Sequence, residues 1–137
     1  MKKTTEKFRE WIEKKIEVEF TQNDKNLPDV WEFWRYYEGM NVGNEISKDW
    51  KHMRACLILK TNTWNELVLI CPLTSARTKW RYFVEINQES WLPKASCGVI
   101  NQIKFIDKKR LAGLILATKK LPKTSDYIKK YFAEIIL

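Results

Sequence analysis

Four short runs rich in β-branched and aromatic residues follow one another through the middle of the chain, with no helical pattern between them. The runs are ACLILK (55–60), ELVLICPL (66–73), WRYFVEI (80–86) and CGVINQIKFI (97–106). Strands spaced this closely, without intervening helices, pair with antiparallel neighbours. The pattern therefore predicts an antiparallel sheet that curls into a small β-barrel.

One further strand is predicted on each side of these four. VWEFWRYY (30–37) is aromatic and β-branched, and the loop EGMNVGNE (38–45) follows it with two of the four glycines. After a short turn at 108–111, LAGLILATKKL predicts a last strand before residue 122. The sheet therefore extends over residues 30–121.

A helix is predicted at each end of the chain. Apolar residues recur at steps of three and four near the N-terminus, with Thr4 or Thr5 as the N-cap: Phe8, Trp11, Ile12, Ile16 and Phe20. A second apolar stripe lies near the C-terminus: Tyr127, Ile128, Tyr131, Phe132, Ile135 and Ile136. We expect a mainly β (α+β) domain over residues 1–137: a helix and connector (1–29), a β-barrel (30–121) and a C-terminal helix (122–137).

Composition narrows the class of protein. The three cysteines are odd in number and lack a C-x-x-C spacing, so neither a disulfide framework nor a zinc site is indicated. The longest uncharged apolar stretch, LVLICPL, is too short to cross a bilayer, and the lysine-rich N-terminus has no apolar signal region. These features favour a cytoplasmic protein with no membrane partner.

Positive charge is concentrated in the centre of the chain. Residues 51–110 hold eleven basic and four acidic side chains, whereas residues 21–50 hold three basic and six acidic ones. Aromatic residues lie among the central basic groups: Trp64, Trp80, Tyr82 and Trp91. Cations attract phosphate and aromatic rings stack on unpaired bases, so this mixture suits single-stranded nucleic acid. A solvated basic surface over an aromatic core remains the alternative.

Several catalytic schemes are excluded. His52 is the only histidine, which rules out a paired-histidine ribonuclease and a multi-histidine metal site. The sequence also lacks a G-x-S-x-G elbow, a P-loop and a G-x-G-x-x-G motif. Any catalysis must use Arg, Glu, Thr, Ser, Lys or Tyr.

Four segments occur in order over about residues 31–111: YYEGMNVGNEI, RACLILK, LICPLTS and INQIKFIDKKRL. In this order they resemble the MazF/PemK (Kid) family of toxins from toxin–antitoxin pairs. The resemblance implies a small SH3-like, CcdB/PemK-like antiparallel β-barrel with attached helices, usually as a homodimer. It also implies a metal-independent endoribonuclease that cleaves single-stranded RNA, uses no cofactor and binds a cognate acidic antitoxin.

The resemblance carries over to individual residues. Arg54 matches the arginine that opens the second strand of the family pattern, and Thr74 matches the threonine of P-L-T-S. Glu45 matches the glutamate of the N-[IV]-G-x-E loop. The resemblance predicts that these three residues are catalytic. Contacts to RNA are predicted from neighbouring positions, from the basic segment RTKWR (77–81) and from the late Q-I-R motif: Ser75, Arg77, Lys79, Trp80, Arg81, Gln102 and Lys104.

These residue types suit RNA cleavage by the substrate's own 2′-hydroxyl. A guanidinium presents a planar fork of donors to phosphate, so Arg54 would hold the phosphate, and the family resemblance also assigns it proton transfer. Thr74 would donate its hydroxyl hydrogen to a non-bridging oxygen. Glu45 would accept the 2′-hydroxyl proton or hold Arg54 in place. The structural alternative is a surface pair of Arg54 with Glu45 and a turn stabilised by Thr74 and Ser75.

The sequence departs from the family pattern in several places, among them Asn101 before Gln102 and the added N-terminal helix. Ala55 replaces the proline after the arginine, Lys104 replaces the arginine of Q-I-R, and residues 46–53 lengthen the loop before Arg54. Two other functions stay open at this point. One is a CcdB-like inhibitor that binds DNA gyrase without cutting RNA, and the other is an inactive barrel that binds RNA or protein.

Overall fold

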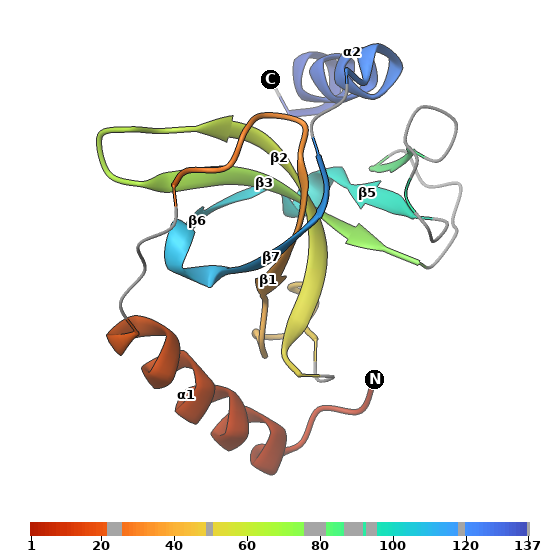
Figure 1. Ribbon diagram of the computed structural model, residues 1–137. Coiled ribbons are helices and arrows are strands. Elements are labelled where there is room, and N and C mark those ends of the chain that lie inside the picture. Colours follow the sequence, from red (N-terminus) through yellow and green to blue (C-terminus); the bar gives the residue numbers. More distant parts are fainter. Residues whose placement is uncertain are drawn as a thin grey trace.

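The computed structural model describes residues 1–21, 26–48, 51–75, 82–86, 92, 96–117 and 120–136. Its elements are α1 (Thr5–Phe20), β1 (Phe33–Tyr37), β2 (Met53–Thr61), β3 (Leu67–Thr74), β4 (Phe83–Glu85), β5 (Cys97–Val99), η1 (Ile100–Gln102), β6 (Lys104–Asp107), η2 (Lys108–Arg110), β7 (Leu111–Leu116), α2 (Pro122–Tyr131) and η3 (Phe132–Ile136). The sheet lies between the two helices, with α1 below it and α2 above it in Figure 1. None of the described helices is long and apolar enough to cross a membrane.

The strands pair in the order β4-β5-β3-β2-β1-β7, and β6 makes a further pairing with β3. Every pairing is antiparallel. Within the described residues the path stays open, because β4 and β7 lie at its two ends and do not pair. The predicted antiparallel, mainly β fold with a helix at each end is confirmed, but the strand path does not close into a ring.

The segment 97–106 differs from its prediction as a single strand. It forms β5 and β6, separated by the 3-10 turn η1. Thr74 of β3 pairs with Cys97, and Ile70 of β3 pairs with Lys104. The two pairings are therefore four residues apart along β3 but seven residues apart along the segment 97–104. The three extra residues form η1 and bend the segment, as a large bulge does.

Strand β1 begins later than predicted, at Phe33 rather than residue 30. Trp31 has a φ of 70°, which strands do not accommodate. Its N–H nevertheless donates to the Ile58 carbonyl at 2.7 Å, so the turn is tied to the edge of β2. Of the predicted strand 80–86, residues 80 and 81 lie outside the described residues.

Helix α1 starts as predicted, but most of its apolar stripe is exposed. Thr4 is the N-cap, and its Oγ1 accepts a hydrogen bond from the Lys7 N–H at 3.2 Å. Trp11 is the one fully buried member of the stripe, with 5% of its surface exposed, whereas Phe20 is 82% exposed. The helix therefore joins the domain mainly through Trp11.

Two apolar clusters occupy the two faces of the sheet. One contains Phe33 and Leu57 and is covered by α2, which contributes Ile128. The other contains Tyr36 and Ile58 and lies on the opposite face. The alternation of Leu57 and Ile58 between the clusters follows from the two-residue period of a strand.

The three cysteines are buried thiols that form no disulfide and lie inside these clusters or next to them. Burial raises the pKa of Cys71 to about 12 and also raises that of Cys56 well above its ordinary value. A thiol that stays protonated is a poor nucleophile, so we treat Cys56 and Cys71 as packing residues.

Candidate nucleic-acid site

The open end of the β2–β3 pairing brings Arg54 and Thr74 together. The two strands pair as far as Cys56 and Pro72. Continuing this register by two residues places Arg54 opposite Thr74, the last residue of β3. The strand is fully buried from Ile70 to Leu73 and becomes partly exposed at Thr74. The apolar strand thus reaches the surface beside the arginine.

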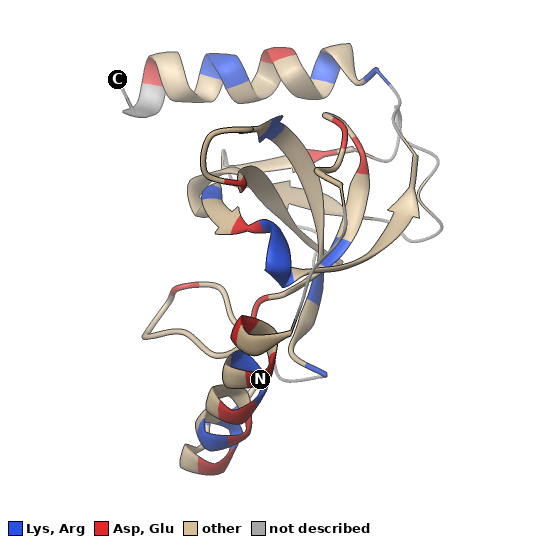
Figure 2. Ribbon diagram, turned by 60° about the vertical axis from the view of Figure 1, so that its left-hand side comes forward, with Lys and Arg blue, Asp and Glu red and all other residues tan. Residues whose placement is uncertain are grey.

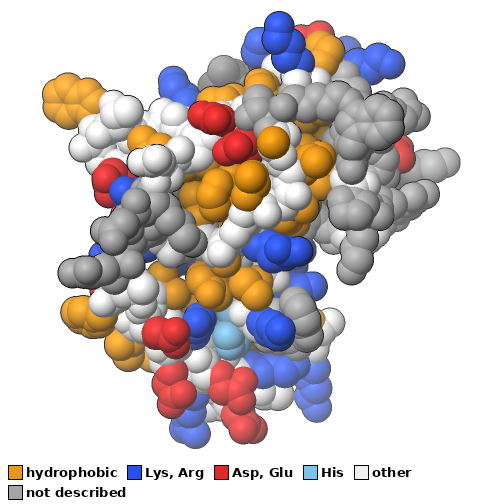
Figure 3. All heavy atoms as spheres, viewed as in Figure 1, with side chains coloured by type: hydrophobic (Ala, Val, Ile, Leu, Met, Phe, Trp, Pro, Cys, Tyr) orange, Lys and Arg blue, Asp and Glu red, His pale blue; other side chains and the backbone are white. Residues whose placement is uncertain are grey.

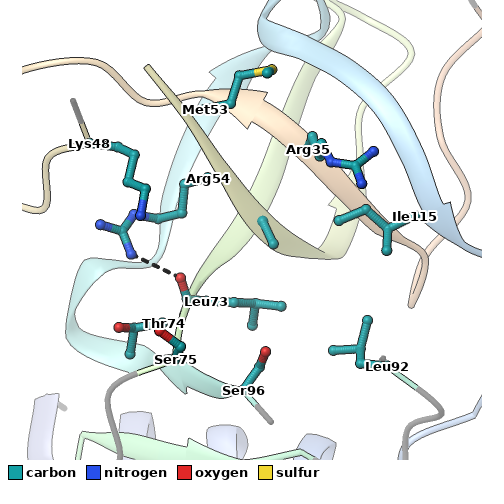
Figure 4. Close-up of a pocket in the computed structure, with 11 residues that line it drawn as sticks. Arg35, Lys48, Met53, Arg54, Leu73, Thr74, Ser75, Leu92, Ser96 and Ile115 are labelled. Carbon is teal, nitrogen blue, oxygen red and sulfur yellow. Dashed lines mark hydrogen bonds between the residues drawn. The ribbon is translucent and has the colours of Figure 1, made fainter. Parts of the chain in front are cut away.

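The Arg54 guanidinium is held by two backbone carbonyls. Its Nη1 donates to the Leu73 carbonyl at 3.0 Å, and its Nη2 donates to the Ser47 carbonyl at 2.7 Å. Its Nε is buried and has no hydrogen-bond partner among the described residues. Figure 4 shows the guanidinium next to Thr74, with the bond to Leu73 drawn as a dashed line. Neutral carbonyls fix the group without neutralising its charge.

A pocket of about 550 Å³ opens in front of this pair. Three cations line it, namely Arg35, Lys48 and Arg54, together with the hydroxyls of Thr74, Ser75 and Ser96 and several apolar side chains. The described lining contains no carboxylate. A pocket of this size accommodates a small organic ligand or one unit of a polymer, and its charge favours an anion.

Sequence reasoning missed Arg35, Lys48 and Ser96. Arg35 carries the single charge in strand β1, FWRYY, and this isolated charge in an aromatic run was the available signal. Lys48 lies in the stretch 46–53 that lengthens the loop before Arg54. Nothing in the local sequence around Ser96 distinguishes it from an ordinary loop serine.

Glu45, Gln102 and Lys104 lie elsewhere. They line a second pocket of about 380 Å³, together with Asn41 and Arg110. Gln102 is tied to the loop there, because its Oε1 accepts from the Ile46 N–H at 3.4 Å. The structure therefore brings Arg54, Thr74 and Ser75 together, as the sequence predicts, but it does not bring Glu45 to them.

Lys104, which lines the second pocket, forms an ion pair with a buried carboxylate. Glu38 is fully buried and pairs with the Lys104 ammonium, while the Tyr36 hydroxyl donates to Glu38 at 2.7 Å. Burial, and next the Glu38 charge, raise the pKa of Tyr36 well above its ordinary value, so the phenol stays a donor. The pairing with Glu38 gives Lys104 a structural partner that the sequence did not indicate.

The loop between β1 and β2 is closed at its base and held from outside by α1. Its two ends meet where the Glu38 and Gly39 N–H groups donate to the His52 carbonyl at 2.8 and 3.1 Å, and within the loop the Lys48 N–H donates to the Gly39 carbonyl at 2.7 Å. Gly39 has a φ of +70°, and a Cβ there would lie 2.0 Å from the Trp11 ring. Lys3 adds a hydrogen bond to the Asn41 carbonyl at 2.8 Å. Trp11 therefore packs on the closure point of the loop that presents the Ser47 carbonyl and Lys48 to the pocket.

Basic side chains also lie in the turn η2, close to helix α1. Figure 2 shows that the short turn η2 is entirely basic and lies close to α1. Figure 3 shows an apolar patch over the sheet, with both basic and acidic side chains below it. The predicted RNA contacts Arg77, Lys79, Trp80 and Arg81 lie outside the described residues.

Residues 39–129 match the family model of the PemK-like, MazF-like toxins of type II toxin–antitoxin systems. This chain belongs to that family. The matched region contains both Arg54 and Thr74, whereas helix α1 precedes it. The family resemblance drawn from the sequence is confirmed.

Solved structures of PemK/MazF proteins share the fold. MazF from Deinococcus radiodurans aligns with a TM-score of 0.65 at 16% identity, over 82% of this chain and 98% of that one. A mycobacterial endoribonuclease aligns with a TM-score of 0.57 at 17% identity, over 81% and 92%. A mycobacterial endoribonuclease in complex with its cognate antitoxin gives 0.55 at 17% identity, over 80% and 94%. No curated protein sequence matches the chain.

Proposed function

We propose that this PemK/MazF-family chain is an endoribonuclease toxin that cleaves single-stranded RNA in the Arg54–Thr74 pocket. The observation that carries the proposal is the fixed, unneutralised Arg54 guanidinium, whose register places it opposite the Thr74 hydroxyl in a pocket without described carboxylates. Phosphate diesters are among the anions whose geometry such a fork of donors matches.

The proposed reaction uses the 2′-hydroxyl of the RNA as its nucleophile. The 2′-oxygen forms a bond to the adjacent phosphorus and loses its proton, and the bond from phosphorus to the 5′-oxygen breaks. The departing 5′-oxygen takes up a proton. The products are a 2′,3′-cyclic phosphate and a 5′-hydroxyl end, so no water is consumed in this step.

Arg54 and Thr74 would act on the charge that develops at phosphorus. The guanidinium would donate to the phosphate oxygens, and the Thr74 hydroxyl would donate to a non-bridging oxygen. The family resemblance implies that Arg54 also takes part in proton transfer. Since Glu45 lines the neighbouring pocket, we assign it to RNA contact together with Gln102, and not to the first proton transfer.

We further propose an acidic antitoxin and a second copy of the chain as protein partners, in the cytoplasm. The mycobacterial relative in complex with its cognate antitoxin supports the first of these. The formal net charge of +8 supports it as well, because an acidic segment that orders on binding would be attracted to the RNA surface.

The proposal is tested by incubating the purified protein with a defined single-stranded RNA in excess EDTA. We expect cleavage at a rate unchanged by the chelator, because Arg54 and Thr74 supply the stabilisation and the RNA supplies the nucleophile. The fragments should carry cyclic phosphate and 5′-hydroxyl ends. Loss of cleavage in EDTA that Mg²⁺ restores, or fragments with 5′-phosphate ends, would contradict this mechanism.

A further inference from the structure

Arg35, one of the two cations that sequence reasoning missed, lies at the end of the pocket away from Arg54 (Figure 4). It is an exposed residue in the middle of β1. Its strand neighbours are small: Ala55 on β2 and Gly113 on β7. A Cβ at Gly113 would meet nothing within 4 Å. The space around the Arg35 guanidinium is therefore open toward the pocket.

An apolar floor separates the two arginines. Figure 4 shows Arg54 and Lys48 on one side of the pocket and Arg35 on the other, beside Ile115. Leu73 lies between them in Figure 4. Ala55 also lines the pocket, and it follows Arg54 on β2 and pairs with Arg35 on β1. Apolar surface does not bind phosphate, but it accepts the face of a base or a sugar.

The distribution of charge points to a polyanion in this pocket. Arg35, Lys48 and Arg54 share one cavity, and like charges in a common pocket repel one another unless an anion lies between them. None of the described salt bridges involves any of the three. The second pocket differs, because Glu45 and Asp107 line it together with basic groups.

We propose that Arg35 binds a second phosphate of the RNA, one linkage away from the phosphate held at Arg54. The nucleotide between these two phosphates would lie over the apolar floor. This inference rests on the proposed RNA cleavage and adds a substrate position to it. Arg35 is then a substrate-binding residue that fixes the register of the RNA relative to Arg54.

The test combines Arg35→Ala with RNA that carries one uncharged linkage. In an RNA whose cleaved bond has been mapped, the phosphates flanking that bond are replaced one at a time by methylphosphonate. With the wild-type protein, one replacement should lower kcat/KM by about 10-fold, the effect of one lost hydrogen bond to a charged group. Arg35→Ala should lower kcat/KM on unmodified RNA by a similar factor, and Arg35→Lys by less.

Combining the two changes should cause no further loss, because both remove the same contact. Arg9→Ala serves as the control, since Arg9 is an exposed arginine on α1 that lines neither pocket. Losses that multiply, or an Arg35→Ala protein as active as Arg9→Ala, would overturn the second phosphate position while wild-type cleavage still stands. Failure of the wild-type protein to cut any RNA would overturn the proposed function itself.

Discussion

Arg54→Ala should slow RNA cleavage by roughly 10²–10⁴-fold while the protein remains folded. In the proposed reaction the side chain supplies the fork of donors for the phosphate, and no other described group occupies its place between the Ser47 and Leu73 carbonyls. The loss of those two hydrogen bonds should cost about 1–3 kcal/mol of stability, which a folded domain tolerates. Single-turnover cleavage and circular dichroism of the same preparations measure the two effects.

Matched variants separate charge from geometry at this position. Arg54→Lys should also be strongly impaired, since an ammonium keeps the charge but cannot present two parallel donors. Thr74→Ala should lose activity through the missing hydroxyl, whereas Thr63→Ala, in the exposed turn between β2 and β3, should cut normally. Wild-type rates for both Arg54→Ala and Thr74→Ala would move catalysis away from this pocket.

Trp11→Ala should lower the free energy of unfolding by about 3–5 kcal/mol, the usual range for truncating a buried tryptophan. Its indole is 5% exposed and contacts Gly39, and its centroid lies 5.4 Å from that of the His52 ring. Urea unfolding followed by circular dichroism gives the value.

The same helix supplies the control for this prediction. Phe20→Ala removes a side chain that is 82% exposed and should change the free energy of unfolding by less than about 0.5 kcal/mol. Equal effects of the two substitutions would mean that α1 is not attached to the domain through Trp11.

Much of the fold was predictable because strand and helix periods are local properties of the sequence. The run ELVLICPL and the N-capped helix at Thr5–Phe20 are examples. The division of 97–106 was not predictable from the same signals, since η1 arises from a register difference against β3. Exposure of Phe20 likewise depends on where α1 packs, which periodicity does not determine.

Only those residues of the candidate site that belong to family motifs could be predicted from the sequence. Arg54 and Thr74 belong to motifs that the family resemblance carries, and the β2–β3 register brings them together. Arg35 comes from a strand that carries no motif, and its proposed role depends on the pairing with Ala55 and Gly113. Glu45 belongs to a family motif, but it lines the second pocket and not the pocket that contains Arg54 and Thr74.

In the proposed mechanism the RNA itself supplies the nucleophile at the Arg54–Thr74 pocket. The most direct measurement uses two RNAs that differ by one atom, the 2′-oxygen of the nucleotide on the 5′ side of the cleaved bond. With that 2′-hydroxyl replaced by hydrogen, cleavage at this bond should stop, while other sites in the same RNA are cut as before. Cleavage of the 2′-deoxy linkage at the rate of the unmodified RNA would contradict the account.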